Sequence, residues 1–187
     1  SEIVIDDIEA LNYAREIDSS LNLNVHRVGA LSKHLSGKEL VDFKSFIQNG
    51  ITIFSDDGKS LIEDTLADEA FKIVAELGGA IFQHCEKSCF SNPGDIAPPS
   101  NLSELILIPE SEEFEILKRD LELVEKYNTR YHAQHLSSKK SVELIEQAKN
   151  KQLPVTAEVT PHHLLINNEN LDTTSGTYKM YPPIRSE

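Results

Sequence analysis

Two histidines and a pair of acids share one setting, because each stands where an apolar run of the sequence ends. They are His84 after 80–83, His135 after 131–134, and Asp56 with Asp57 after 51–54. Such short apolar runs are typical of buried strands. Imidazole nitrogens are favoured ligands of zinc and similar ions, and carboxylate oxygens can complete such a site or bridge two ions. The pattern indicates a metal site at one edge of a sheet.

Each of these residues also has a purely structural interpretation. A histidine that ends an apolar strand can be a core residue with a backbone hydrogen bond, and Asp-Asp-Gly is an ordinary turn sequence. Their joint occurrence at the same end of several strands favours the metal site, since the carboxyl ends of parallel strands meet at one edge.

Helical and strand patterns alternate along the chain. The expected helices are 6–19, 38–48, 62–77, 110–127 and 138–149, and the expected strands include 51–54, 80–84, 131–135 and 153–159. We expect Asp6 to cap the first of these helices and Ser137 or Ser138 to cap the last. Helix 62–77 is the clearest, because its apolar residues recur at helical spacing and Gly78 suits a left-handed stop.

The alternation predicts one α/β domain over residues 1–187. About five strands separated by helices imply a parallel sheet with right-handed crossovers, either an open doubly wound sheet or a (β/α) barrel. The polar, proline-containing stretch 86–107 is too long for a plain connection, so we expect a loop over the strand ends.

Composition narrows the class of partner. The chain has 31 acidic and 18 basic residues and a net charge of −13, which disfavours nucleic acid and anionic membranes as partners. The two cysteines, Cys85 and Cys89, are too close in sequence for a disulfide between them to stabilise the fold. They favour a reducing compartment. No apolar run approaches the roughly 20 residues of a membrane span, and no signal peptide is recognisable. We therefore expect a cytoplasmic protein.

Several motifs, taken in order, resemble those of dihydroorotases, the metal-dependent cyclic amidohydrolases of pyrimidine synthesis. They are FSDDG (54–58), HCE (84–86), the run 132–149, VTAEVTPHHLL (155–165) and YKMYPPIRSE (178–187). The resemblance implies an amidohydrolase (β/α)₈ TIM barrel. It also implies reversible cyclisation of N-carbamoyl-L-aspartate to dihydroorotate, in which, in the hydrolytic direction, a metal-activated water attacks a cyclic amide.

The resemblance assigns roles to particular residues. It implies that His84, His135 and Asp57, rather than Asp56, bind one or two Zn²⁺ ions. Tyr181 stands where the family usually has a substrate-binding asparagine. We expect His163 to be structural, whereas the alternation of an extended strand turns His132 and Cys85 away from the site.

Two elements of the family site are not found in the sequence: a His-X-His pair and a catalytic aspartate on a later strand. We therefore interpret the chain as the central part of a longer enzyme, an incomplete barrel with no catalytic residue of its own and no activity alone. The expected partners are the small-molecule substrate and either a second copy, as a homodimer, or a transcarbamoylase.

Two rival functions are also compatible with the sequence. A hydantoinase or allantoinase shares the barrel, but such relatives usually carry a lysine where FSDDG stands. A catalytically inactive dihydroorotase-like scaffold that serves a transcarbamoylase is the second rival. The retained His84 and His135 argue against the scaffold, whereas Tyr181 favours it.

Overall fold

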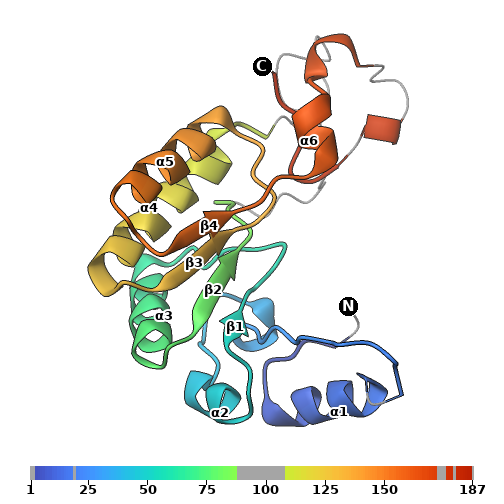
Figure 1. Cartoon of the computed structure of the whole chain (residues 1–187), viewed down its shortest axis with the longest axis vertical. Coiled ribbons are helices and arrows are strands. Elements are labelled where there is room, and N and C mark those ends of the chain that lie inside the picture. The colour runs from blue at the N-terminus through green and yellow to red at the C-terminus, as the bar shows by residue number, and fades with distance from the viewer. Residues whose placement is uncertain (1–2, 19, 88–107, 172–175, 179, 187) are drawn as a thin grey trace.

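The computed structural model describes residues 3–18, 20–87, 108–171, 176–178 and 180–186. Helices and strands alternate through most of this part of the chain (Figure 1). The elements are α1 Ile8–Asp18, α2 Phe43–Gln48, β1 Ile53–Phe54, α3 Asp64–Glu76, β2 Ala80–Gln83, α4 Ser111–Tyr127, β3 Arg130–Ala133, α5 Lys139–Asn150, β4 Val155–Ala157 and α6 Pro161–Leu165, with 3₁₀ turns at Lys33–Leu35, Asn168–Asn170 and Gly176–Tyr178.

The four strands form one parallel sheet in the order β1-β2-β3-β4. The crossover helices α3, α4 and α5 all cover the same face of this sheet (Figure 1). A doubly wound sheet reverses its strand order at a switch point and carries helices on both faces. Neither feature is present among the described strands. The sequential order and one-sided helices are those of a (β/α) barrel wall.

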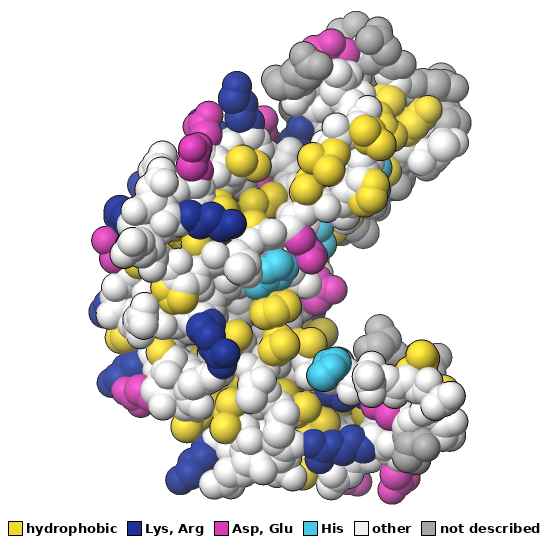
Figure 2. Space-filling view, viewed as in Figure 1, with side chains coloured by type: hydrophobic (Ala, Val, Ile, Leu, Met, Phe, Trp, Pro, Cys, Tyr) yellow, Lys and Arg dark blue, Asp and Glu magenta, His cyan; other side chains and the backbone are white. Residues whose placement is uncertain are grey.

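The two faces of the sheet have different environments. The row of residues paired across the strands and packed against the helices is buried and consists of Phe54, Ile81, Tyr131 and Val155. The next row, Phe82, His132 and Thr156, lies on the other face and is only partly covered. The space-filling view in Figure 2 is hollowed between the two ends of the molecule. The core therefore lies between the sheet and its helices.

The helix predicted over 62–77 forms as α3, with somewhat narrower bounds, Asp64–Glu76. Ala67, Ala70, Phe71 and Val74 recur at helical spacing and are buried against the sheet. The chain leaves the helix through Gly78, whose φ of +70° is the left-handed conformation that a residue with a Cβ rarely adopts. The predicted glycine stop is confirmed.

The predicted cap of the first helix was wrong by one residue, and α1 begins at Ile8 rather than at residue 6. The side chain of Asp7, not Asp6, accepts a hydrogen bond from the backbone N–H of Ala10 (2.8 Å). Asp6 is buried and accepts instead from the backbone N–H of His34 (2.8 Å), so it ties the start of the chain to the 3₁₀ turn. The carboxylate of Asp6 is therefore engaged by the 3₁₀ turn and does not cap the helix.

The helix predicted over 38–48 is also shorter in the structure, where only α2 forms. Asp42 caps it, because its carboxylate accepts hydrogen bonds from the backbone N–H (3.1 Å) and hydroxyl (2.5 Å) of Ser45. The predicted loop 86–107 lies almost wholly outside the described residues. None of the described helices is long and apolar enough to cross a membrane.

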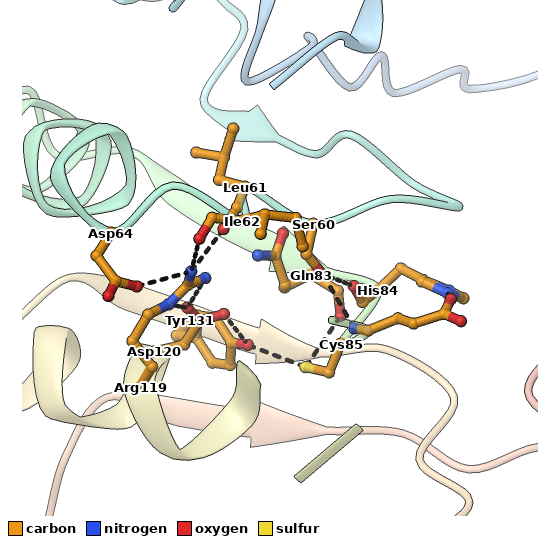
Figure 3. A network of polar contacts seen from close by, with 11 residues as sticks. Ser60, Leu61, Ile62, Asp64, Gln83, His84, Cys85, Arg119, Asp120 and Tyr131 are labelled. Carbon is orange, nitrogen blue, oxygen red and sulfur yellow. Dashed lines mark hydrogen bonds and ion pairs between the residues drawn. The ribbon is translucent and has the colours of Figure 1, made fainter. Parts of the chain in front are cut away.

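A polar network lies between the sheet and α4. Tyr131 donates a hydrogen bond to Asp120 (2.9 Å) and contacts the thiol of Cys85 (3.2 Å). Arg119 binds the other oxygen of Asp120 and the carbonyl of Leu61 (2.6 Å). Figure 3 shows this network extending from Arg119 to Cys85, the neighbour of His84. Cys85 therefore points away from the candidate site, as predicted.

Candidate metal centre

Three side chains with metal-binding atoms meet at the carboxyl edge of the sheet. Asp57 follows β1, His84 follows β2 and His135 follows β3, and one ligand atom from each lies within 4.8 Å of the other two. Nδ1 of His84 is 3.1 Å from Nε2 of His135, and that Nε2 is 3.8 Å from Oδ1 of Asp57. The parallel strands bring these residues together although 78 positions separate Asp57 from His135.

His135 reaches this group because the strand stops before it. The prediction of a strand over 131–135 was too long, since β3 ends at Ala133. In an extended strand His135 would point to the opposite face from His132. Its φ of +33° instead departs from the extended conformation, and its ring centroid lies 4.7 Å from that of His84.

The two neighbouring acids have different surroundings. Asp56 is buried, and its carboxylate accepts hydrogen bonds from the backbone N–H groups of Leu31 (2.7 Å) and Ser32 (3.0 Å) and from the Ser32 hydroxyl. These contacts hold the preceding segment against the strand end. Asp57 is exposed and faces His135. The geometry therefore gives Asp56 a structural role and leaves the Asp57 carboxylate available to a ligand.

Electrostatics at the site couple Asp57 to His135. The contact with His135, reinforced by the charge of His84, lowers the pKa of Asp57. Burial lowers the pKa of His135, but the interaction with Asp57 outweighs burial, so the net pKa lies above its ordinary value. The negatively charged carboxylate of Asp57 therefore lies beside two imidazoles, and this arrangement suits a divalent cation.

His84 is enclosed on its remaining sides. Its Nε2 lies 3.0 Å from Oε2 of Glu86, and both side chains are buried. The ring of Tyr181 stacks on the imidazole with centroids 5.0 Å apart and an interplanar angle of 26°. The sequence alone did not identify Glu86 as a site residue, although its place in the HCE motif, two residues from His84, was a usable signal.

The C-terminal segment is held against the site by buried polar contacts. Arg185 donates hydrogen bonds to the Ser137 hydroxyl (3.1 Å) and to the carbonyl of Ile108 (2.5 Å), and it is 7% exposed. His163 contacts the Thr160 hydroxyl (2.6 Å) and the carbonyl of Pro182 (3.1 Å). Both residues brace the segment that carries Tyr181, so neither is aimed at the three-residue group.

The donor set suits a zinc-type ion. Two ligand atoms of a tetrahedral zinc, each about 2.0–2.1 Å from the metal, stand about 3.3 Å apart. The nitrogens of His84 and His135 have nearly this separation, and a small shift of Asp57 would bring its oxygen to a similar one. Two imidazoles and one carboxylate leave further positions for water or substrate.

Sequence comparison places the chain among known proteins. No family model matches it. It is 36% identical over 173 residues to the dihydroorotase of Elusimicrobium minutum, covering 91% of this chain and 40% of that protein. It is 35% identical over 188 residues to the dihydroorotase of Macrococcus caseolyticus, covering 98% of this chain and 43% of that protein. The chain thus spans about two-fifths of the length of these curated relatives.

Structural comparison shows the same fold in solved proteins. L-hydantoinase from Arthrobacter aurescens superposes with a TM-score of 0.73 at 20% identity, covering 97% of this chain and 42% of that one. A D-hydantoinase superposes with a TM-score of 0.71 at 18% identity, covering 96% and 42%. These likenesses, with the sequential parallel sheet, show that the chain has the fold of part of a (β/α) barrel. By its sequence, the chain is a homologue of dihydroorotases, at 35–36% identity over most of its length.

Proposed function

We propose that the protein to which this chain contributes is a dihydroorotase. It would catalyse the reversible cyclisation of N-carbamoyl-L-aspartate to dihydroorotate in de novo pyrimidine synthesis. The observation that carries the proposal is the meeting of Asp57, His84 and His135 within 4.8 Å, in a chain about 35% identical to dihydroorotases. Histidines with a purely structural role would have no need to meet each other and a carboxylate from a third strand end.

The chain's own residues have distinct tasks in this proposal. Asp57, His84 and His135 would hold one or two Zn²⁺ ions. When bound, such an ion polarises a carbonyl and lowers the pKa of water, which is the chemistry that hydrolysis of a cyclic amide requires. Tyr181, stacked on His84, covers one side of the group and restricts how a substrate can approach it.

Metal analysis of point variants tests the ligand set. His84→Ala and His135→Ala should each lose bound zinc, because each removes a nitrogen of the group. His163→Ala is the matched histidine control and should keep zinc, since its nitrogens contact Thr160 and Pro182 instead. Full zinc content in both site variants, measured by elemental analysis of folded protein, contradicts the proposed site.

The neighbouring acids provide a second, sharper comparison. Asp57→Asn should lower zinc affinity and leave folding intact, because Asp57 is exposed and faces His135. Asp56→Asn should instead lower stability, because it weakens three buried hydrogen bonds to Leu31 and Ser32. Zinc titrations and thermal unfolding of the two variants separate these effects. The reverse pattern would assign the ligand role to Asp56.

We further propose that the 187-residue chain alone does not turn over dihydroorotate. It spans about two-fifths of its relatives' length, and the one metal-binding group found among the described residues has three members. Hydrolysis of dihydroorotate with added zinc should stay at the background rate for this chain. Robust zinc-dependent turnover would mean that the chain supplies a complete catalytic site.

The alternatives are distinguishable by substrate. The solved structures of similar fold are named hydantoinases, but at 17–20% identity they support the fold alone. A full-length protein carrying this chain should hydrolyse dihydroorotate in preference to hydantoin or allantoin. Loss of all three activities together with retained binding to a transcarbamoylase would favour the scaffold. We also propose a cytoplasmic location, with which the free thiol of Cys85 is consistent.

A further inference from the structure

Glu86 makes a direct contact with one of the proposed metal ligands. Its Oε2 lies 3.0 Å from Nε2 of His84, and the two side chains are 7% and 3% exposed. The other ring nitrogen of His84, Nδ1, faces His135. A carboxylate accepts hydrogen bonds, so this contact places the ring proton of His84 on Nε2 and leaves the lone pair of Nδ1 facing the metal group.

The backbone around Glu86 is held as firmly as its side chain. The hydroxyl of Ser60 donates to the carbonyl of His84 (2.5 Å) and accepts from the backbone N–H of Glu86 (3.0 Å). Ser60 lies in the loop that follows Asp57, so this bridge also joins two of the three strand ends. Figure 3 shows Ser60 and His84 side by side at the end of the polar network.

The two carboxylate oxygens of Glu86 differ in their hydrogen bonding. Oε1 is buried without a hydrogen-bond partner among the described residues. Burying a carboxylate with few hydrogen bonds costs free energy, and an apolar side chain of similar length would avoid that cost. The contact with His84 offers a functional reason for an acid at this position.

We propose that Glu86 is a positioning residue, which orients the His84 ring and holds Nδ1 ready as the metal ligand. This inference rests on the proposed metal site. Ligating histidines commonly donate their second ring N–H to a carboxylate, and loss of such a partner weakens metal binding about 10–100-fold.

Two variants separate positioning from packing. Glu86→Gln keeps the side-chain shape and an oxygen that accepts from Nε2, whereas Glu86→Met keeps the length but offers only a thioether sulfur, which is a weak acceptor. If Glu86 orients His84, the methionine variant should bind zinc about 10–100-fold more weakly than the wild type, and the glutamine variant should recover most of that loss. Glu115→Met is the matched control, because Glu115 is half-exposed and pairs with Lys87 at the surface.

The ring tautomer of His84 provides a readout that needs no metal. In the wild-type chain without zinc, two-bond ¹H–¹⁵N NMR spectra should place the proton of His84 on Nε2, in slow exchange with water. Glu86→Met should produce a mixture of tautomers or fast exchange of that proton, and Glu86→Gln should retain the wild-type spectrum. A structural role limited to packing would not distinguish these two variants.

Each outcome decides one of the two proposals. An unchanged His84 tautomer in Glu86→Met, or equal zinc affinity in the methionine and glutamine variants, overturns the role of Glu86. Absence of zinc binding by the wild-type chain counts against the metal site instead, and the tautomer comparison still decides whether Glu86 orients His84. Circular dichroism of each variant verifies that it is folded.

Discussion

Replacing Glu113 should destabilise the chain more than replacing any exposed acid on the same helix. Glu113 lies in the first turn of α4 and is 4% exposed. Its carboxylate accepts hydrogen bonds from the backbone N–H groups of Ser137 (3.0 Å) and Ser138 (3.0 Å) and from the Ser137 hydroxyl. Ser138 is the N-cap residue of α5, whose backbone N–H has no partner within the helix, and Ser137 directly precedes it.

The size of the effect follows from these contacts. Loss of a helix cap costs about 1–2 kcal/mol, and removal of a partly buried anion from a helix start costs about 0.5–2 kcal/mol. A second buried N–H left unpaired adds about 1–3 kcal/mol. We expect Glu113→Ala to lose about 3–5 kcal/mol of unfolding free energy, and Glu113→Gln, which keeps one acceptor oxygen, to lose about half as much.

Urea unfolding followed by circular dichroism measures this loss. With a slope of about 2 kcal/mol per molar urea, Glu113→Ala should lower the unfolding midpoint by about 2 M. Glu115→Ala is the control from the same helix, since its half-exposed pair with Lys87 is worth about 0–1 kcal/mol. A loss below about 1 kcal/mol for Glu113→Ala would refute the capping role.

Two further predictions follow from the same structure. Burial and the nearby Asp120 raise the pKa of Cys85 well above its ordinary value. Iodoacetamide at pH 8 should therefore leave Cys85 unmodified in the folded chain and modify it in urea, as measured by peptide mass mapping. Rapid labelling of Cys85 in the folded chain would contradict this prediction. Hydrogen bonds from Lys126 and Tyr127 lower the pKa of Asp68, so its contribution to stability should be present above pH 3.8 and be lost as the pH falls through the lowered value. Thermal unfolding should therefore show wild type and Asp68→Asn converging in acid, and a difference that grows on acidification would contradict the assignment.

Sequence periodicity located the main helices and strands to within a few residues, because helical and extended patterns are local properties of the chain. Helix 62–77 appears as α3 with its glycine stop. Boundaries were less accurate where a polar side chain had a competing partner. The carboxylate of Asp6 accepts from the backbone N–H of His34 and does not cap α1. Ser138 is the N-cap residue of α5, as predicted, but its side chain makes no capping hydrogen bond, and Glu113 accepts from its backbone N–H instead.

The sequence by itself determined that His84, His135 and an acid of the Asp-Asp pair stand after strands, and family motifs narrowed the acid to Asp57. Only the tertiary structure decided that these residues meet, since their distance depends on strand order and register between segments far apart in the chain. The left-handed backbone at His135, the stacking of Tyr181 and the contact of Glu86 with His84 likewise arise from packing at the strand ends. Periodicity describes which face a residue occupies within its own element, whereas long-range packing decides which side chains that face will contact.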